Sequence, residues 1–351
     1  MELSVWQTTL LTLLIVAVLL LPLTVHKIEK NLEAFLFVCG LFAVTVSKAW
    51  NWHLISTALQ DPLKITLAVL IAGLLFRQFH TQLQKVTQWA LKKIGLRYTL
   101  TSIVLILGLT SSIITAIIAA LILAEVAVLL PLERKDRVKL VTFACYAIGM
   151  GAILTAIGEP LGAIVISKLS GEPHYAGFFF LIDHLGWYVL AGIILMAGLA
   201  SSLKEGASAQ VPSTNPLAAD EHTVTSILMR AGKVYLFIMA LTLLGDGLKP
   251  LALKTITHLS DGCLYWLNML SSVLDNATLA AIEVTPSITD HSITFLLMSL
   301  IISGGMLIPG NIPNIICASK LGITSKEWAK AAFGLGVMLM IAYFLILTAV
   351  L

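Results

Sequence analysis

Long apolar runs constrain the fold of this chain more than any other feature. Runs of about 20 apolar residues, the length a helix needs to cross the hydrocarbon core of a bilayer, recur from end to end. The chain is 58% hydrophobic and 12% charged, whereas soluble domains carry about 25% charged residues. The sequence therefore predicts an all-α, polytopic membrane protein.

The positions of the apolar runs predict about eight transmembrane helices. Two further apolar segments, near 98–131 and 261–289, are each broken in the middle by a Ser-rich motif. We interpret both as re-entrant helical hairpins, because irregular backbone is tolerated at membrane depth only where protein or a wet cavity surrounds it. The eight spans are expected near residues 4–25, 29–48, 62–80, 138–169, 176–201, 225–246, 291–319 and 327–350.

Basic residues between the runs form four clusters that test this layout. If both hairpins are re-entrant, all four clusters lie on one face, which the positive-inside rule makes cytoplasmic. Both termini are then outside, the first hairpin opens to the cytoplasm and the second opens outward. The clusters consist of His26, Lys27 and Lys30; Lys85, Lys92, Lys93 and Arg97; Arg134, Lys135, Arg137 and Lys139; and Lys320, Lys326 and Lys330.

Two motifs occur twice in the same order. SSIITAIIAALI at Ser111 returns as SSVLDNATLAAI at Ser271, and GEPLGAIVISKL at Gly158 returns as GNIPNIICASKL at Gly310. Together with the charge layout, this predicts inverted-topology repeats with broken helices, although two Leu/Ile-rich strings can also resemble each other by chance. Interrupted segments at matching places in two halves point to a substrate site at the midplane.

The repeats divide the chain into four parts. We expect N-terminal scaffold helices in 1–61, a first repeat in 62–201, a cytoplasmic linker in 202–224 and a second repeat in 225–351.

The second hairpin motif concentrates oxygen-bearing side chains. A carboxylate at membrane depth costs about 2.5–3.5 kcal/mol on insertion scales, so its presence suggests a function. Hydroxyl, amide and carboxylate oxygens suit a hard cation such as Na⁺. The alternative is a simple helix N-cap, which needs no ligand. The residues concerned are Ser271, Ser272, Asp275, Asn276 and Thr278.

The two broken spans add further candidates. Gly310, Asn311 and Asn314 interrupt the later span, and the two Asn side chains can either bind an ion or satisfy backbone freed by a structural kink. In the earlier span Glu159 stands in the place of Asn311, with Thr155 and Gly158 close by. A Na⁺ site is therefore expected at Ser271, Asp275, Asn276 and Asn311.

Asp275 and Glu159 also suggest how a proton could be coupled to the cation. Two carboxylates sharing a dry cavity do not both ionise readily. One of them can hold a proton or, once deprotonated, help to hold Na⁺. Competition for this site, combined with alternating access, gives exchange.

Several polar residues have more than one interpretation. The hydroxyls of Ser111, Ser112 and Thr115 at the first hairpin tip either bind the ion or bond locally to carbonyls. Glu125 either lines the pathway or lies near the interface beside Arg134. Asp183 and His184 form either a proton relay or a packed polar pair.

At these motifs the chain resembles the ion transporter superfamily, which includes D-type Na⁺/H⁺ antiporters, arsenite permeases and dicarboxylate symporters. Within it, the chain is similar to a family of predicted cation transporters with a domain of unknown function. SSVLDNAT is similar to the Ser…Asp-Asn hairpin motif of the D-type antiporters, and GNIPN to the Gly-rich break of a later core helix. The resemblance implies ligand roles for Ser271, Asp275, Asn276, Gly310, Asn311 and Asn314, a homodimer, and elevator-type movement of a core against a scaffold.

These observations predict a secondary transporter of the inner membrane that exchanges a monovalent cation, Na⁺, for protons. The alternative is a Na⁺-coupled symporter or an efflux permease for a small anion. An Arg or Lys deep in the core would favour the anion, and we expect none in the broken segments. Catalysis is not expected, and neither is a cofactor or nucleic acid; membrane lipid, the cation and H⁺ are the expected partners.

Overall fold

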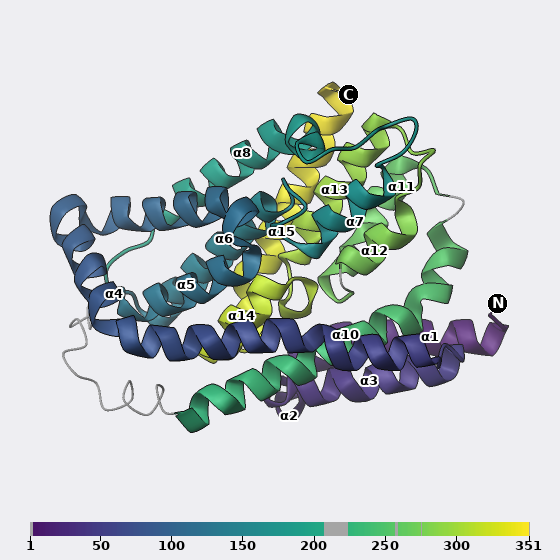
Figure 1. The fold of residues 1–351 in the computed structure, drawn as a ribbon, viewed down its shortest axis with the longest axis horizontal. Coiled ribbons are helices and arrows are strands. Elements are labelled where there is room, and N and C mark those ends of the chain that lie inside the picture. The colour runs from purple at the N-terminus through teal and green to yellow at the C-terminus, as the bar shows by residue number, and fades with distance from the viewer. Residues whose placement is uncertain (1–2, 207–223, 257–258, 275, 351) are drawn as a thin grey trace.

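The computed structural model describes residues 3–206, 224–256, 259–274 and 276–350. Within these ranges the chain contains helices, turns and loops but no strand, which confirms the all-α class (Figure 1). The helices are α1 (Val5–Thr24), α2 (His26–Lys30), α3 (Leu32–Ser47), α4 (Trp52–Ile114), α5 (Ala116–Leu129), α6 (Arg134–Ala152), α7 (Pro160–Lys168), α8 (Phe180–Ala200), α10 (Val224–Ile256), α11 (Asp261–Leu267), η1 (Asn268–Ser272), α12 (Asn276–Glu283), α13 (Asp290–Gly304), η2 (Ile308–Gly310), α14 (Ile312–Leu321) and α15 (Ser325–Val350).

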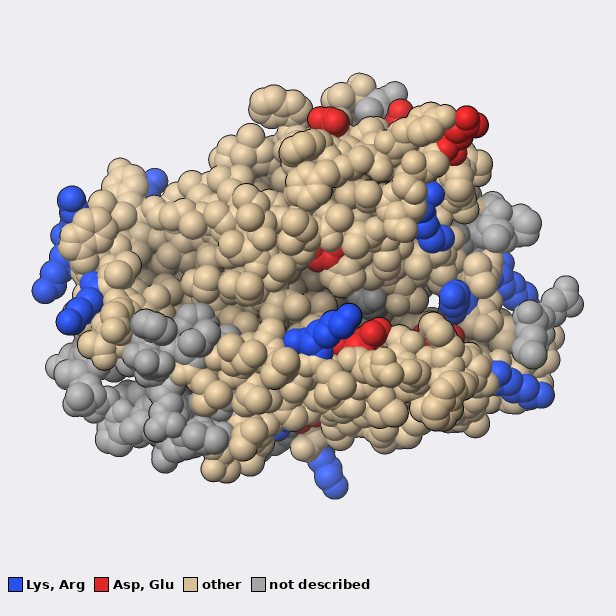
Figure 2. Space-filling view, in the orientation of Figure 1, with Lys and Arg blue, Asp and Glu red and all other residues tan. Residues whose placement is uncertain are grey.

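The chain is a multi-pass membrane protein. In the described part, 6 helical stretches are long and apolar enough to cross a bilayer. Figure 2 shows Lys and Arg at the left end of one face, in its middle and along its right side, acidic side chains at its top and upper right and in its middle, and a largely uncharged surface elsewhere. The stretches are Val5–Thr24, Trp52–Ile71, Thr81–Ile114, Phe180–Ala200, Ala231–Lys254 and Ser325–Val350.

Helices α1, α2, α3, α10 and the first part of α4 form one layer, along the bottom of Figure 1. The packing is close: a Cβ on Gly247 of α10 would lie 2.6 Å from the Cβ of Ala43 in α3. We call this layer the scaffold, and the remaining helices the core.

Helix α4 departs from the prediction, because no break separates the expected span 62–80 from the residues that follow it. No Gly or Pro interrupts residues 74–94, so nothing ends the helix before Gly95. There the backbone becomes non-helical, with φ 78°, and the chain folds back into the core. Similarly, the segment after Lys249 continues α10 to Ile256.

The core contains two broken helices. The predicted span 138–169 is α6 and α7, separated by residues 153–159, and the predicted span 291–319 is α13 and α14, separated by η2. Each lies beside a helical hairpin with a short returning arm. The returning arms α5 and α12 have 14 and 8 residues, or about 21 and 12 Å, and are shorter than the roughly 30 Å hydrocarbon core.

Candidate functional site

The first hairpin tip is a sharp turn at Thr115. Its φ of 75° is uncommon for a β-branched residue, and its Oγ1 accepts a hydrogen bond from the backbone N of Ile118, which caps α5. Ser111 Oγ lies 2.7 Å from Gly108 O and 3.0 Å from Ile148 O, and Ser112 Oγ lies 3.2 Å from Leu109 O. The predicted local bonds to carbonyls are therefore present, while lone pairs on the hydroxyl oxygens remain for a ligand.

The first break is tied directly to this tip. Thr155 Oγ1 donates to the carbonyl oxygen of Ser112, and the N–H of Ala116 donates to Gly158 O at 2.9 Å. Gly158 permits this arrangement, because a Cβ there would lie 2.0 Å from Ala152 O. Glu159 follows as the N-cap residue of α7 and is 6% exposed. Tip and break thus form one unit that presents a buried acid at a helix start.

The second hairpin tip presents buried oxygen and amide groups. Ser271, Ser272 and Asn276 are all buried. Ser271 Oγ lies 3.4 Å from Leu300 O, and Asn276 Nδ2 has no hydrogen-bond partner in the described part of the chain. Thr278, one turn into α12, lies against Gly245 of α10 and thus faces the scaffold. Asp275, the predicted central acid, lies outside the described residues.

The second break is held by Asn314. Its Nδ2 donates to Gly304 O and Leu307 O, both at 2.9 Å, while its Oδ1 has no hydrogen-bond partner among the described residues. The side chain therefore satisfies backbone carbonyls freed by the break, and it also keeps an oxygen that a cation could use. Gly310 lies close to the second tip, because a Cβ there would lie 2.8 Å from Ser271 O.

Asn311 links the two broken helices. It is the N-cap residue of α14 and is 7% exposed. A Cβ on Gly149 of α6 would lie 2.8 Å from its Nδ2. The second break therefore touches the helix that leads into the first.

The second half of each broken helix ends in a lysine that reaches the opposite hairpin. Lys320 of α14 forms an ion pair with Glu125 of α5. Lys168 of α7 donates to Ala281 O at 2.6 Å and to Val284 O at 3.1 Å, at the end of α12. Because these helices also pack side by side, α14 runs parallel to α5 and α7 runs parallel to α12.

It follows that the N-termini of α5, α7, α12 and α14 meet. The bond from Ala116 N to Gly158 O joins α5 to α7, and the approach of Ser271 O to Gly310 joins the second tip to the start of α14. Parallel packing joins the other two pairs. A helix N-terminus carries about half a positive charge, so this ring attracts negative charge. The residues predicted from sequence at these starts are Thr115, Glu159, Asn276 and Asn311.

The position of Lys320, which is only partly exposed, overturns one expectation. We expected no Arg or Lys in the broken segments and placed Lys320 in a loop, but its side chain is 14% exposed and lies against Glu125. The charge is neutralised there, about two helical turns from the ring, so it does not by itself supply an anion site. Glu125 is 4% exposed and does not lie beside Arg134, which instead bonds Glu327 at 2.9 Å.

Asp183 and His184 do not pair with each other in the way a relay requires. Asp183 is exposed in the first turn of α8. His184 Nδ1 lies 2.8 Å from Phe180 O, and its Nε2 lies 3.6 Å from Asp290 Oδ1. The histidine therefore joins α8 to the start of α13.

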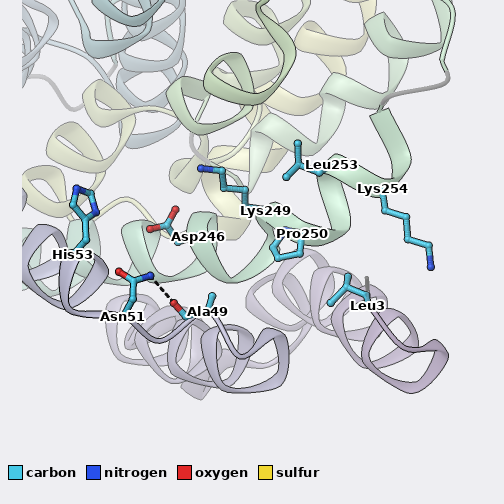
Figure 3. Close-up of a pocket in the computed structure, with 9 residues that line it drawn as sticks. All are labelled: Leu3, Ala49, Asn51, His53, Asp246, Lys249, Pro250, Leu253 and Lys254. Atoms are coloured by element: carbon cyan, nitrogen blue, oxygen red, sulfur yellow. Dashed lines mark hydrogen bonds between the residues drawn. The ribbon is translucent and has the colours of Figure 1, made fainter. Parts of the chain in front are cut away.

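Cavities lie on the seam between scaffold and core, one of them of about 250 Å³ between α10 and α14. Another, of about 890 Å³, opens within the scaffold beside α10, and Figure 3 shows Asp246, Lys249 and His53 around it. Asp246 follows Gly245, whose packing against Thr278 places this cavity next to the second hairpin.

Glu29 of α2 joins scaffold and core outside the membrane-spanning segments. Its Oε1 accepts from the backbone N of Lys326 at 3.3 Å, and His26 Nδ1 lies 3.1 Å from its Oε2. Burial acts to raise the pKa of Glu29, but hydrogen bonds from His26, Thr324 and the Lys326 amide outweigh it and lower the pKa below its usual value. The carboxylate is thus kept charged at this contact.

Sequence reasoning missed three buried polar residues, Glu283, Asn268 and Lys320. The repeated Ser-Lys-Leu, which ends both α7 and α14, was a signal for Lys320. Glu283 has the same kind of position in α12 as Glu125 has in α5, near the end of a hairpin's returning arm.

The comparison with protein families gives one result. The family model of DUF1646, described as a protein of unknown function, matches residues 8–350. No curated protein matches the chain.

Proposed function

The chain belongs to the DUF1646 family, and for it we propose a secondary active transporter that exchanges Na⁺ for protons by alternating access. The observation that carries the proposal is the ring of four helix N-termini. It is built from two broken helices and two hairpin tips, and it presents buried hydroxyl, amide and carboxylate oxygens. Broken helices whose ends converge in this way form the ion sites of many secondary transporters.

The charge balance of the ring supports a cation as the substrate. Four helix N-termini, at about half a positive charge each, amount to roughly two positive charges. The carboxylates of Glu159 and Asp275 balance them when both are ionised. Oxygen atoms of a near-neutral site can then accept either one Na⁺ or a proton, and the two compete.

The same ring supports an anion transporter as the second candidate. If both acids are protonated, the four N-termini leave the site positive, as is suitable for a carboxylate or an oxyanion. This candidate requires the anion to cross together with Na⁺ or alone, without counter-movement of protons.

The proposal also covers the topology of the chain in the membrane, its oligomeric state and its movement during transport. We place the two hairpins as re-entrant elements of inverted repeats, with eight spans, both termini outside and the protein in the inner membrane as a homodimer. The seam cavities support a core that moves against the scaffold in elevator fashion, because water-filled gaps leave fewer contacts to break. The resemblance to the ion transporter superfamily suggests the same movement.

Transport by the purified protein in liposomes tests the proposal. A pH-sensitive dye inside the vesicles should report alkalinisation of an acid-loaded lumen when Na⁺ is added outside. Li⁺ and K⁺ give the cation preference, and choline chloride is the control. Na⁺ flux that requires an added anion and moves no protons would select the second candidate, and no flux of any ion would reject both.

A further inference from the structure

A second buried acid lies apart from the ring, in a cavity of about 320 Å³ between scaffold and core. Helices α1, α10 and the second hairpin form its walls. These walls are mostly apolar and include Ile15, Leu19, Leu248 and Leu279. The polar side chains in the wall are Thr12 of α1, whose hydroxyl donates to Thr8 O, Asn268 of η1 and Glu283 of α12.

Asn268 and Glu283 form a buried pair with two unsatisfied acceptors. The side chains are 1% and 8% exposed. Asn268 Nδ2 donates to Glu283 Oε2 at 3.1 Å and to Ser299 Oγ at 2.9 Å. Asn268 Oδ1 and Glu283 Oε1 are buried, and neither has a hydrogen-bond partner among the described residues. In each group one polar atom is therefore hydrogen-bonded, and the other is an oxygen without a partner among the described residues.

One proton would satisfy both acceptors. A carboxylic acid and a primary amide can form a cyclic pair, in which the acid O–H donates to the amide oxygen and the amide N–H donates to the acid carbonyl. The second bond is already present. An ionised carboxylate with one donor and apolar walls would instead be poorly solvated, and the unsatisfied acceptor beside it would add to the cost of burial.

The contrast with Glu125 strengthens this argument. Glu125 lies on the returning arm of the first hairpin, and Lys320 neutralises it. On the second returning arm Lys168 reaches the carbonyls of Ala281 and Val284. No ion pair to Glu283 is present in the described part of the chain, so a proton is its natural counter-charge.

Titratable groups near α12 lie on the helices packed against it. Neither α1 nor η1 has any. Among the described side chains they are Lys168 of α7 and its N-cap residue Glu159, Lys233, Tyr235, Asp246, Lys249 and Lys254 of α10, and Asp290 and His291 of α13.

We propose that Glu283, paired with Asn268, is a proton-binding site separate from the ring and that it must release its proton for the ring to exchange Na⁺ for a proton. The claim that Glu283 takes part in exchange rests on the proposed function, whereas the claim that Glu283 binds a proton does not. Glu283 ends the same 8-residue helix that begins at Asn276. A shift of α12 caused by a change in the charge of Glu283 therefore also moves Asn276 at the ring. Loss of the proton places a charge against the apolar scaffold wall, which favours movement of the hairpin along the seam.

Chemical labelling of the wild-type protein tests for the bound proton directly. Dicyclohexylcarbodiimide is an apolar reagent that modifies protonated carboxyl groups, and peptide mass spectrometry locates the modified residue. We expect Glu283 to be modified at neutral pH and progressively less as the pH is raised. An unmodified Glu283 at neutral and mildly acidic pH, or modification that does not change with pH, overturns the proposal.

Transport by Glu283→Gln tests the exchange role. Gln can donate to Asn268 Oδ1 and accept from Asn268 Nδ2, so it imitates the protonated state. We expect this variant to retain exchange of labelled Na⁺ for unlabelled Na⁺ and to lose Na⁺-driven proton movement. The matched control is Glu205→Gln, at an exposed position, which should transport as the wild type does.

The outcomes separate the two proposals. A wild-type protein that moves neither Na⁺ nor H⁺ rejects the proposed function, while the labelling still decides whether Glu283 holds a proton. A wild type that exchanges Na⁺ for H⁺, together with a Glu283→Gln variant that does so equally well, rejects the role of Glu283 and leaves the proposed function standing.

Discussion

Replacing Asp275 by Asn is expected to abolish Na⁺/H⁺ exchange while the protein still inserts and folds. Asn keeps the size of the side chain, but it can neither bind a proton at physiological pH nor offer a negative charge. With Asp275 neutral, the ring of N-termini loses about half of the charge that balances it, and Na⁺ binding loses its main electrostatic contribution. The measurement is Na⁺-driven alkalinisation of acid-loaded vesicles.

The matched control for this variant is Asp183→Asn. Asp183 is exposed in the first turn of α8, so the same chemical change there should leave exchange intact. Size-exclusion profiles of both variants should match the wild type. Exchange by Asp275→Asn at the wild-type rate would remove Asp275 from the ion site and show that its neighbourhood serves only to start a helix.

Replacing Lys320 by Met is expected to destabilise the core strongly. The change leaves the carboxylate of Glu125 buried in α5 without its ion pair, and breaking a buried pair in this way costs about 3–5 kcal/mol. The variant should unfold at a clearly lower temperature in detergent, and less of it should be recovered from membranes. Thermal unfolding followed by size-exclusion chromatography measures both effects.

The double variant distinguishes the ion pair from packing. Glu125→Leu combined with Lys320→Met removes both charges, and buried pairs replaced by apolar residues are often as stable as before. The double variant should therefore be more stable than Lys320→Met alone. Lys326→Met, at an exposed position in α15, should unfold as the wild type does. A Lys320→Met protein with wild-type stability would mean that the pair contributes nothing to the core.

Much of the fold follows from the apolar pattern, because a membrane-spanning helix must satisfy its backbone internally and must present an apolar surface over a fixed length. The pattern located α1, α8, α10 and α15 to within a few residues, apart from the continuation of α10 beyond residue 246. It also located both breaks, since Gly158 and Gly310 are followed within three residues by Pro160 and Pro313. The candidate site was predicted from the same breaks, because the oxygen-bearing residues cluster there in the sequence.

The pairing of α14 with α5 and of α7 with α12 could not be predicted, because it depends on how the two halves interlock in space. Lys320 appeared to belong to a loop because it lies at the end of an apolar run, and only the position of Glu125 makes it a core residue. Glu283 was missed for the same reason. Its place beside Asn268 and α1 depends on contacts between residues that are far apart in the chain.

Competition between Na⁺ and protons for the protein is the central claim, and proton release on Na⁺ binding tests it most directly. The purified protein is placed in weakly buffered detergent solution with a pH indicator, and NaCl is added stepwise. We predict a saturable acidification with Na⁺, none with choline chloride and none with Asp275→Asn. Calorimetric binding of Na⁺ by the wild type without any release of protons would contradict the account.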